Sequence, residues 1–201
     1  EPGPGDLLVD VKAAAVTYPD LLMVGGKYQF TPDYPYIPGS EAAGVVIGIG
    51  SDVDGWQVGD RVVGGLGLAG AFAERAVVPA HRAVRIPDGV EFDAATGLEY
   101  AYGTALYALR DRGALQAGET VLVTGAAGSV GLAAIEIAKL LGATVVAAAS
   151  SDERLRLCRA RGADELVNYA TENLRERLRQ ITGGAGLDVV FCGLPHQASM
   201  E

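Results

Sequence analysis

The chain has 201 residues, of which 49% are hydrophobic and 20% charged, so it has enough apolar material for a core and is not typical of a disordered protein. Its formal net charge of −9 argues against a nucleic-acid partner, because such proteins neutralise phosphates with Lys and Arg. Two cysteines form neither a disulfide framework nor a four-ligand zinc cluster, and no apolar run reaches the ~18 residues of a membrane helix, so we expect a cytoplasmic protein without a membrane partner.

The first ninety residues combine short apolar stretches with turn residues. Strands are predicted at 7–16, 45–47, 61–63 and 72–78, and Gly, Pro and Asp separate them. Short strands at turn spacing are typical of a compact, barrel-like β domain. We place this domain at residues 1–90.

After residue 90 the pattern changes to alternating helices and strands. A helix is expected at 92–112, followed by strands at 120–124, 144–149, 165–168 and 187–191, with helices at 131–141, 152–161 and 171–182 between them. Apolar strands that alternate with helices predict a parallel sheet covered on both faces. Residues 91–201 are therefore predicted to form an α/β, doubly wound domain.

A dinucleotide site needs a strand, a glycine-rich turn and a helix start in that order, and residues 121–131 (VLVTGAAGSVG) supply it. Gly128 would let the backbone approach a pyrophosphate, and Gly131 would let the helix pack closely on the strand. Ser129 and Val130 would offer backbone N–H groups to the anion at the helix N-terminus. An alanine occupies the first glycine position of the strict fingerprint, and the alternative is a tight connection without a ligand.

The second strand of this domain ends in Ser150 and Ser151, where an NAD site would place an Asp or Glu for the ribose 2′-hydroxyl. Arg154 follows one turn into the next helix, so a 2′-phosphate would meet hydroxyl groups and a guanidinium. This pattern favours NADPH. The alternative makes Ser151 an ordinary helix N-cap and Arg154 a solvated helix residue, and capping could coexist with phosphate binding.

Seven stretches occur in the order found in a known family: 13–20 (AAAVTYPD), 26–28 (GKY), 38–44 (PGSEAAG), 58–62 (VGDRV), 103–104 (GT), 125–131 (GAAGSVG) and 167–169 (VNY). Together they resemble the medium-chain dehydrogenase/reductase superfamily, and specifically its zinc-free NADPH:quinone oxidoreductase (zeta-crystallin-like) branch. The resemblance implies a GroES-like β-barrel domain followed by a truncated Rossmann domain. It also implies that the nicotinamide of the cofactor lies in the cleft between these domains.

The resemblance implies a role for several residues. Three would lie near the nicotinamide and bind the acceptor: Thr17, Asp20 and Tyr28. Thr104 would approach the nicotinamide side of the cofactor, and Tyr169 would join Arg154 at the adenosine 2′-phosphate. No residue is assigned as catalytic, and structural alternatives are a helix cap for Asp20 and loop packing for Tyr28.

Zinc alcohol dehydrogenases of the superfamily carry a Cys ligand where this chain has Thr17 and a His ligand where it has Ser40. A zinc ion would find neither a thiolate nor an imidazole at these positions. We therefore expect a metal-free protein.

The resulting expectation is an oxidoreductase that transfers hydride from NADPH to a quinone or another electron-poor acceptor without zinc. Two alternatives remain open: a 2-enoyl thioester (enoyl-CoA type) reductase of the same superfamily, and a truncated, non-catalytic NADP-binding or structural protein. Family members run well beyond this length, so we expect a truncated chain with poor activity. The full-length protein could form a homodimer through an edge of its Rossmann sheet, and we expect this chain to lack that edge.

Overall fold

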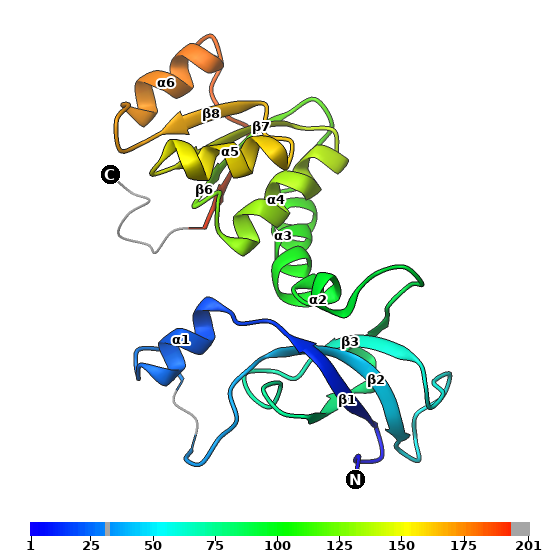
Figure 1. Cartoon of the computed structure of the whole chain (residues 1–201). Coiled ribbons are helices and arrows are strands. Elements are labelled where there is room, and N and C mark those ends of the chain that lie inside the picture. The colour runs from blue at the N-terminus through cyan, green and yellow to red at the C-terminus, as the bar shows by residue number, and fades with distance from the viewer. Residues whose placement is uncertain (31–32, 194–201) are drawn as a thin grey trace. The chain divides into compact units, whose positions relative to one another are not determined.

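The computed structural model describes residues 1–30 and 33–193 and contains two compact units, Glu1–Tyr100 and Ala101–Glu201 (Figure 1). Each unit has its own sheet and its own buried clusters. The boundary that we place between residues 90 and 91 concerns sequence domains and stays a prediction.

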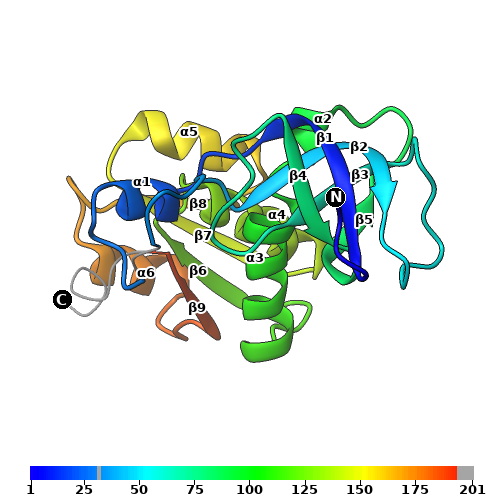
Figure 2. The ribbon, with the colours of Figure 1, turned by 90° about the horizontal axis from the view of Figure 1, so that it is seen from below.

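The first unit is built on a five-stranded antiparallel sheet with the order β4-β1-β2-β3-β5. Its strands are β1 (Asp6–Ala14), β2 (Glu41–Ile49), β3 (Arg61–Gly65), β4 (Arg75–Pro79) and β5 (Ala83–Arg85). Leu7 and Val9 alternate with more exposed neighbours along β1, and both are fully buried against Val46, Val62 and Val78. Alternation of this kind is what a strand with one buried face requires. Figure 2 shows β1 beside β2 and β4.

Three short helices complete the first unit: α1 (Tyr18–Val24), η1 (Ala80–Arg82) and α2 (Phe92–Ala95). A helix at α1 was considered only as the structural alternative for Asp20, although Pro19 at its start and Asp20 in its first turn are typical of a helix N-terminus. The predicted strand at 72–78 is shifted, because β4 begins only at Arg75.

The single helix expected at 92–112 is wrong, because the chain breaks after α2. Thr96 is extended and Gly97 has a φ of +95°, a conformation that ends a helix and favours glycine. A second helical stretch then runs through η2 (Leu98–Gly103), α3 (Thr104–Leu106) and η3 (Tyr107–Arg112). Both η2 and η3 are π-helical, so α3 is one α-helical turn between two wider ones.

The second unit confirms the predicted parallel sheet. Its strand order is β8-β7-β6-β9, and the strands are β6 (Thr120–Thr124), β7 (Thr144–Ala149), β8 (Glu165–Asn168) and β9 (Val189–Cys192). Three helices connect them: α4 (Ser129–Leu140), α5 (Asp152–Ala160) and α6 (Leu174–Ile181). After β8 the chain returns to the other side of β6, so the strand order reverses between β6 and β9. Ligands of open α/β sheets bind at such a point, beyond the carboxyl ends of the strands.

Both faces of this sheet are buried, as the apolar strands predict. Val121 and Val123 of β6 pack with Ala134 and Ile135 of α4 on one face, and Leu122 packs beneath α6 on the other. Two helices differ from their expected bounds: α4 runs from Ser129 to Leu140, so it begins two residues earlier and ends one residue earlier than predicted, and α6 is shorter and covers only Leu174–Ile181. Among the described residues, no helix is long and apolar enough to cross a bilayer.

Candidate functional site

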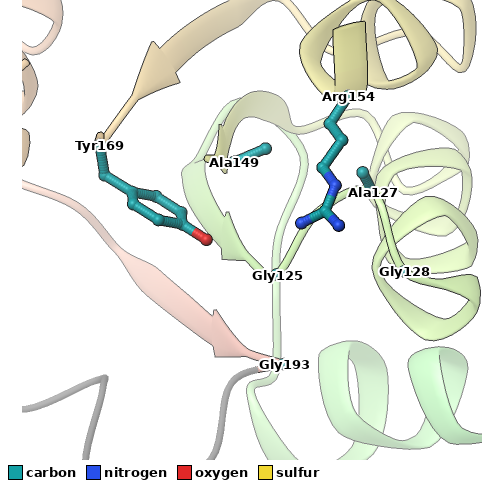
Figure 3. Close-up of a pocket in the computed structure, with 7 residues that line it drawn as sticks. All are labelled: Gly125, Ala127, Gly128, Ala149, Arg154, Tyr169 and Gly193. Atoms are coloured by element: carbon teal, nitrogen blue, oxygen red, sulfur yellow. The ribbon is translucent and has the colours of Figure 1, made fainter. Parts of the chain in front are cut away.

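A cavity of about 290 Å³ lies at the carboxyl ends of the strands of the second unit (Figure 3). Its walls come from the residues that follow β6 and β8, the last residue of β7, the first turn of α5 and the residue after β9. The lining residues are Gly125, Ala127, Gly128, Ala149, Arg154, Tyr169 and Gly193. The cavity therefore occupies the place where the strand order reverses.

The glycine-rich turn forms one wall of this cavity. Gly125 has a φ of +61°, and its carbonyl accepts a hydrogen bond of 3.0 Å from the N–H of Gly128. A Cβ atom on Gly131 would lie 2.5 Å from the Gly125 oxygen and 2.7 Å from the Ala126 oxygen, so no side chain fits there. Gly128 is the N-cap of α4 and is exposed, so the first N–H groups of this helix, which include those of Ser129 and Val130, face the turn without intrahelical acceptors.

Arg154 faces the cavity from the first turn of α5. Its Nη1 donates a hydrogen bond of 3.1 Å to Ser150 Oγ, and its backbone N–H donates one of 3.4 Å to Ser151 Oγ. Ser151 thus caps α5 while the Arg154 side chain reaches toward the cavity, so both of the roles considered above are compatible. Within the described part of the chain, no carboxylate forms an ion pair with Arg154. The nearby Asp152 instead accepts a hydrogen bond of 2.7 Å from Asn168 Nδ2.

Tyr169 closes the opposite side of the cavity. It follows β8 directly, and its backbone N–H donates a hydrogen bond of 3.1 Å to the Ala149 carbonyl. Its side chain is 37% exposed and its hydroxyl points into the cavity, across from the Arg154 guanidinium (Figure 3). The cavity thus has a cation on one side and a phenol on the other.

Thr104 lies in a second cavity of the same unit. This cavity, of about 410 Å³, runs between the helix that contains α3 and the strand β9. It is lined by Thr104, Ala108, Leu109, Arg112, Gly113, Val189, Val190, Phe191 and Cys192. Cys192 lines this cavity and the next residue, Gly193, lines the first one, so the carboxyl end of β9 contributes to both.

The three residues predicted to bind the acceptor lie in the first unit, and two of them are in contact. Thr17 donates to Asp20 Oδ2 through its hydroxyl at 2.6 Å and its backbone N–H at 2.7 Å. The N–H of Gly39 donates to the other oxygen of Asp20 at 3.1 Å. Asp20 is 2% exposed, so its carboxylate braces α1 against the segment that leads into β2. Tyr28 is half-buried, and no hydrogen bond joins it to Thr17 or Asp20.

The residues at the two zinc-ligand positions of the alcohol dehydrogenases do not fit zinc. The Thr17 hydroxyl is engaged with Asp20, and Ser40, which is fully buried, offers only another hydroxyl. Zinc prefers thiolate and imidazole ligands. No group of three or more His, Cys, Asp or Glu side chains in residues 1–30 and 33–193 could hold a metal ion. Independence of zinc stays a prediction that rests on this donor set.

Four residues that line the first cavity were not predicted: Gly125, Ala127, Ala149 and Gly193. Three of them lie at or just beyond the carboxyl end of a strand, which is the available signal in an open parallel sheet. Gly193 also has no room for a side chain, because a Cβ atom would lie 2.8 Å from the Thr124 carbonyl oxygen.

Two family models match the chain. One is described as the alcohol dehydrogenase GroES-like domain and matches residues 3–88; the other is described as zinc-binding dehydrogenase and matches residues 129–201. Quinone oxidoreductase-like protein 2 of Rattus norvegicus is 40% identical over 190 residues, which are 94% of this chain and 54% of the relative. The chain thus spans about half the length of the curated relatives that it matches.

Solved structures give the same result. The quinone oxidoreductase of Pseudomonas syringae has a TM-score of 0.91 and 35% identity over 100% of this chain and 61% of its own. The Escherichia coli quinone oxidoreductase complexed with NADPH has a TM-score of 0.83 and 33% identity over 92% of this chain and 56% of its own. The CurK enoyl reductase has a TM-score of 0.89 and 30% identity over 98% of this chain and 61% of its own.

These matches confirm the predicted fold of a GroES-like domain followed by a partial Rossmann sheet. The chain has the α/β fold of the medium-chain dehydrogenase/reductases and is similar to quinone oxidoreductases over about half of their length.

Proposed function

We propose that the chain binds NADPH in the cavity of Figure 3 and is the nucleotide-binding part of an oxidoreductase that transfers hydride to a quinone without zinc. The observation that carries the proposal is Arg154, which is hydrogen-bonded to Ser150, has no carboxylate partner among the described residues and lies across the cavity from Tyr169. A guanidinium and a hydroxyl at this place suit a 2′-phosphate, whereas NAD sites use a carboxylate.

Each side chain then has a defined task. Arg154, Ser150 and Tyr169 hold the 2′-phosphate end of the dinucleotide. The exposed N–H groups at the start of α4 take the pyrophosphate, with Gly128 leaving space for it. When bound, NADPH supplies the hydride. Thr104 contacts the nicotinamide side, whereas Thr17, Asp20 and Tyr28 serve the acceptor, and no residue is assigned as the proton donor.

The charge distribution supports a neutral acceptor such as a quinone. Residues 1–100 contain six Lys and Arg against fourteen Asp and Glu, whereas residues 101–201 contain ten against eleven. The acidic unit is the one that carries the predicted acceptor residues. It repels an anionic substrate such as a coenzyme A thioester, although salt screens this effect.

The second candidate function is reduction of an enoyl thioester. The similarity to the CurK enoyl reductase favours it, since that structure matches as well as the quinone oxidoreductases do. A third candidate is a non-catalytic NADP-binding or structural protein, which the acceptor experiment below separates from the first two.

The cofactor is tested by titrating the chain with NADPH and NADH while nicotinamide fluorescence is followed. We expect tight binding of NADPH only, and a loss of at least tenfold in affinity in Arg154→Glu. Arg156→Glu is the matched control, because Arg156 is exposed on the same helix and does not line the cavity. Equal binding of both cofactors, or equal effects of the two substitutions, contradicts the phosphate assignment.

The acceptor is tested by adding a simple quinone or a 2-enoyl thioester to the NADPH complex and following NADPH oxidation. Faster oxidation with the quinone supports the first candidate and faster oxidation with the thioester the second. Cofactor binding without oxidation by either acceptor supports the non-catalytic alternative.

A further inference from the structure

Glu136 joins three elements of the second unit. Its Oε2 accepts a hydrogen bond from the hydroxyl of Tyr102, which belongs to η2. Its Oε1 pairs with Arg161 Nη1 at 2.7 Å, just beyond the end of α5. Glu136 itself lies near the middle of α4, the helix that begins at the glycine-rich turn. One carboxylate therefore fixes the helix that carries Thr104 to the helix that faces the pyrophosphate.

Partial burial makes these contacts stronger than those of an open surface pair. The Glu136 side chain is 29% exposed. Burial alone would raise the pKa of Glu136, but the Tyr102 hydroxyl and the Arg161 guanidinium outweigh it and hold this pKa below its ordinary value. The pKa of Tyr102 is raised because its hydroxyl donates to this carboxylate and is partly buried. Glu136 is thus ionised and accepts through both oxygens near neutral pH.

The helix that carries Tyr102 has an unusual geometry around Thr104. Thr104 begins the single α-helical turn between the π-helical segments η2 and η3. π-helical turns are rare, and they are frequently found at functional sites. Tyr102 is two residues before Thr104, so its hydrogen bond acts at the junction where the helix changes from π to α geometry.

The carboxyl end of β9 contributes to both the cavity of Thr104 and the cavity beside the glycine-rich turn. Cys192 lines the cavity of Thr104, and the next residue, Gly193, lines the cavity of Figure 3. A dinucleotide is longer than either cavity, so its two halves need a fixed distance between the turn and Thr104. Ala105 and Leu109 share a buried cluster with Ala134 of α4, and Glu136 adds a polar contact between the same two helices at Tyr102.

We infer that Glu136 is a positioning residue, which acts through Tyr102 to hold Thr104 at the place where it meets the nicotinamide half of the dinucleotide. This inference rests on the proposed binding of NADPH and adds a residue that does not touch the cofactor. It predicts that loss of the contact between Glu136 and Tyr102 weakens the binding of the whole dinucleotide but not the binding of its adenosine half alone.

The test compares two ligands, NADPH and adenosine 2′,5′-bisphosphate, whose binding to the full chain is measured by calorimetry. Tyr102→Phe removes only the hydroxyl that contacts Glu136. We expect it to weaken NADPH about fivefold to tenfold, the effect of one lost hydrogen bond, and to leave the bisphosphate within about twofold. Tyr107→Phe is the matched control, because Tyr107 is 57% exposed on the same helix and has no hydrogen-bond partner among the described residues; it should change neither affinity.

A second variant keeps the test independent of one substitution. Glu136→Gln retains an acceptor oxygen for Tyr102 but loses the charge, so we expect NADPH affinity between those of the wild type and Tyr102→Phe. Equal weakening of both ligands in the folded variants means a purely structural role and overturns the inference, as does an unchanged NADPH affinity. If the wild type binds the bisphosphate and NADPH equally well, contacts of the nicotinamide half with Thr104 add no affinity. The inference then fails, whereas the proposed 2′-phosphate site is not contradicted. Binding of neither ligand overturns the proposed cofactor together with the inference.

Discussion

Gly131 and Gly128 stand three residues apart in one turn, yet a methyl group would meet different surroundings at each. At Gly131 it would lie 2.5 Å and 2.7 Å from two backbone oxygens, which cannot move without shifting the turn. At Gly128 the nearest atom is 3.4 Å away, an ordinary contact, and its φ of −77° suits any residue. Packing thus requires a glycine at residue 131, whereas Gly128 leaves open space in front of α4.

We therefore predict that Gly131→Ala destabilises the second unit by about 1–3 kcal/mol, the range for overpacked sites. Gly128→Ala should leave the free energy of unfolding nearly unchanged and weaken NADPH binding, because its methyl group would occupy the space that we propose for the pyrophosphate. Urea denaturation followed by circular dichroism measures the first effect, and fluorescence titration the second. Similar unfolding midpoints for the two variants would show that the turn can shift to accept a side chain at residue 131.

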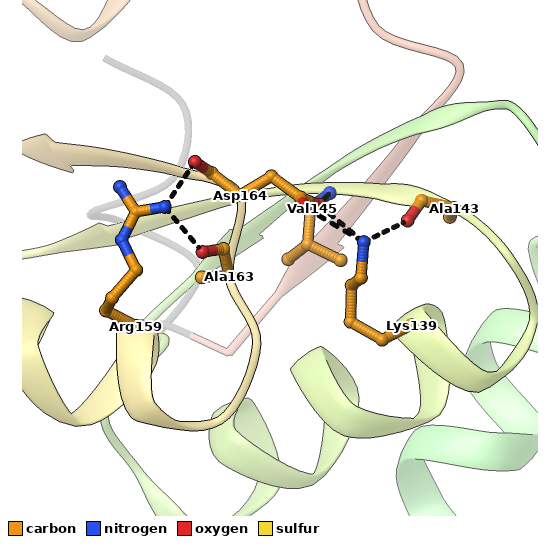
Figure 4. A network of polar contacts seen from close by, with 6 residues as sticks. All are labelled: Lys139, Ala143, Val145, Arg159, Ala163 and Asp164. Atoms are coloured by element: carbon orange, nitrogen blue, oxygen red, sulfur yellow. Dashed lines mark hydrogen bonds and ion pairs between the residues drawn. The ribbon is translucent and has the colours of Figure 1, made fainter.

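At the scale of elements, a polar network holds the end of the sheet opposite the cavity (Figure 4). Lys139 Nζ near the end of α4 donates to both carboxylate oxygens of Asp164, at 2.9 Å and 2.8 Å, and to the Ala143 carbonyl at 3.1 Å. The N–H of Val145 in β7 donates to the same carboxylate at 2.7 Å. Arg159 donates to the carbonyls of Ala163 and Asp164. Asp164 thereby joins α4, the start of β7 and the turn before β8.

The pKa of Asp164 gives this network a predictable pH dependence. Partial burial would raise the pKa, but the hydrogen bonds from Lys139 and Val145 and the charges of Lys139 and Arg159 outweigh it and hold the pKa below its ordinary value of 3.8. A carboxyl whose pKa is lowered by folding contributes stability above its ordinary pKa and loses it as the pH falls through the folded value.

Asp164→Asn should therefore destabilise the protein by about 1 kcal/mol at pH 7, a modest value because solvent screens a pair whose carboxylate is 38% exposed. The difference between wild type and variant should narrow as the pH falls below about 3.8. Urea denaturation at a series of pH values measures it. A difference that stays constant with pH would mean that the charge of Asp164 contributes nothing.

The same scale shows how far the sequence predicts the structure. The parallel strands β6 to β9 were predicted because each is a short apolar run bounded by turn residues. Such runs are typical of strands that are buried on both faces of a parallel sheet. The break at Gly97 was missed, because Ala and Leu on both sides continue the helical pattern and only the positive φ of one glycine interrupts it. The geometry of η2 and η3 was missed as well, since residue spacing does not distinguish a π-helix from an α-helix.

Part of the candidate site could be predicted from the sequence, and part of it could not. Gly128, Arg154 and Tyr169 were selected by motif or family position, and they line one cavity in the structure. Glu136 was not, because its role depends on Tyr102 and Arg161, which are far from it in sequence and meet it only after folding. Asp20 was selected, and its carboxylate accepts three hydrogen bonds from nearby backbone and side-chain groups. Its contact with an acceptor stays a prediction.

At the scale of the whole molecule, the two units differ in charge and in core. Residues 1–100 carry nearly all of the net negative charge, whereas residues 101–201 are close to neutral. None of the hydrophobic clusters in the described part of the chain draws residues from both units. The near-neutral second unit would repel an anionic dinucleotide less than the acidic first unit would, which agrees with the proposed place of the cofactor.

Separate cores predict separate unfolding transitions. The single tryptophan, Trp56, lies in the first unit, where the Arg85 guanidinium stacks 4.3 Å from the ring centroid, so its fluorescence reports only that unit. Circular dichroism reports both units, because helices α4, α5 and α6 belong to the second. In urea the two signals should give different midpoints. A ligand that binds only the folded second unit should raise the free energy of unfolding of that unit by about 2.7 kcal/mol when its concentration is a hundred times Kd. The transition that Trp56 reports should then keep its midpoint. Coincident transitions that shift together with NADPH would instead mean that the continuous helix from η2 to η3 couples the units into one cooperative structure.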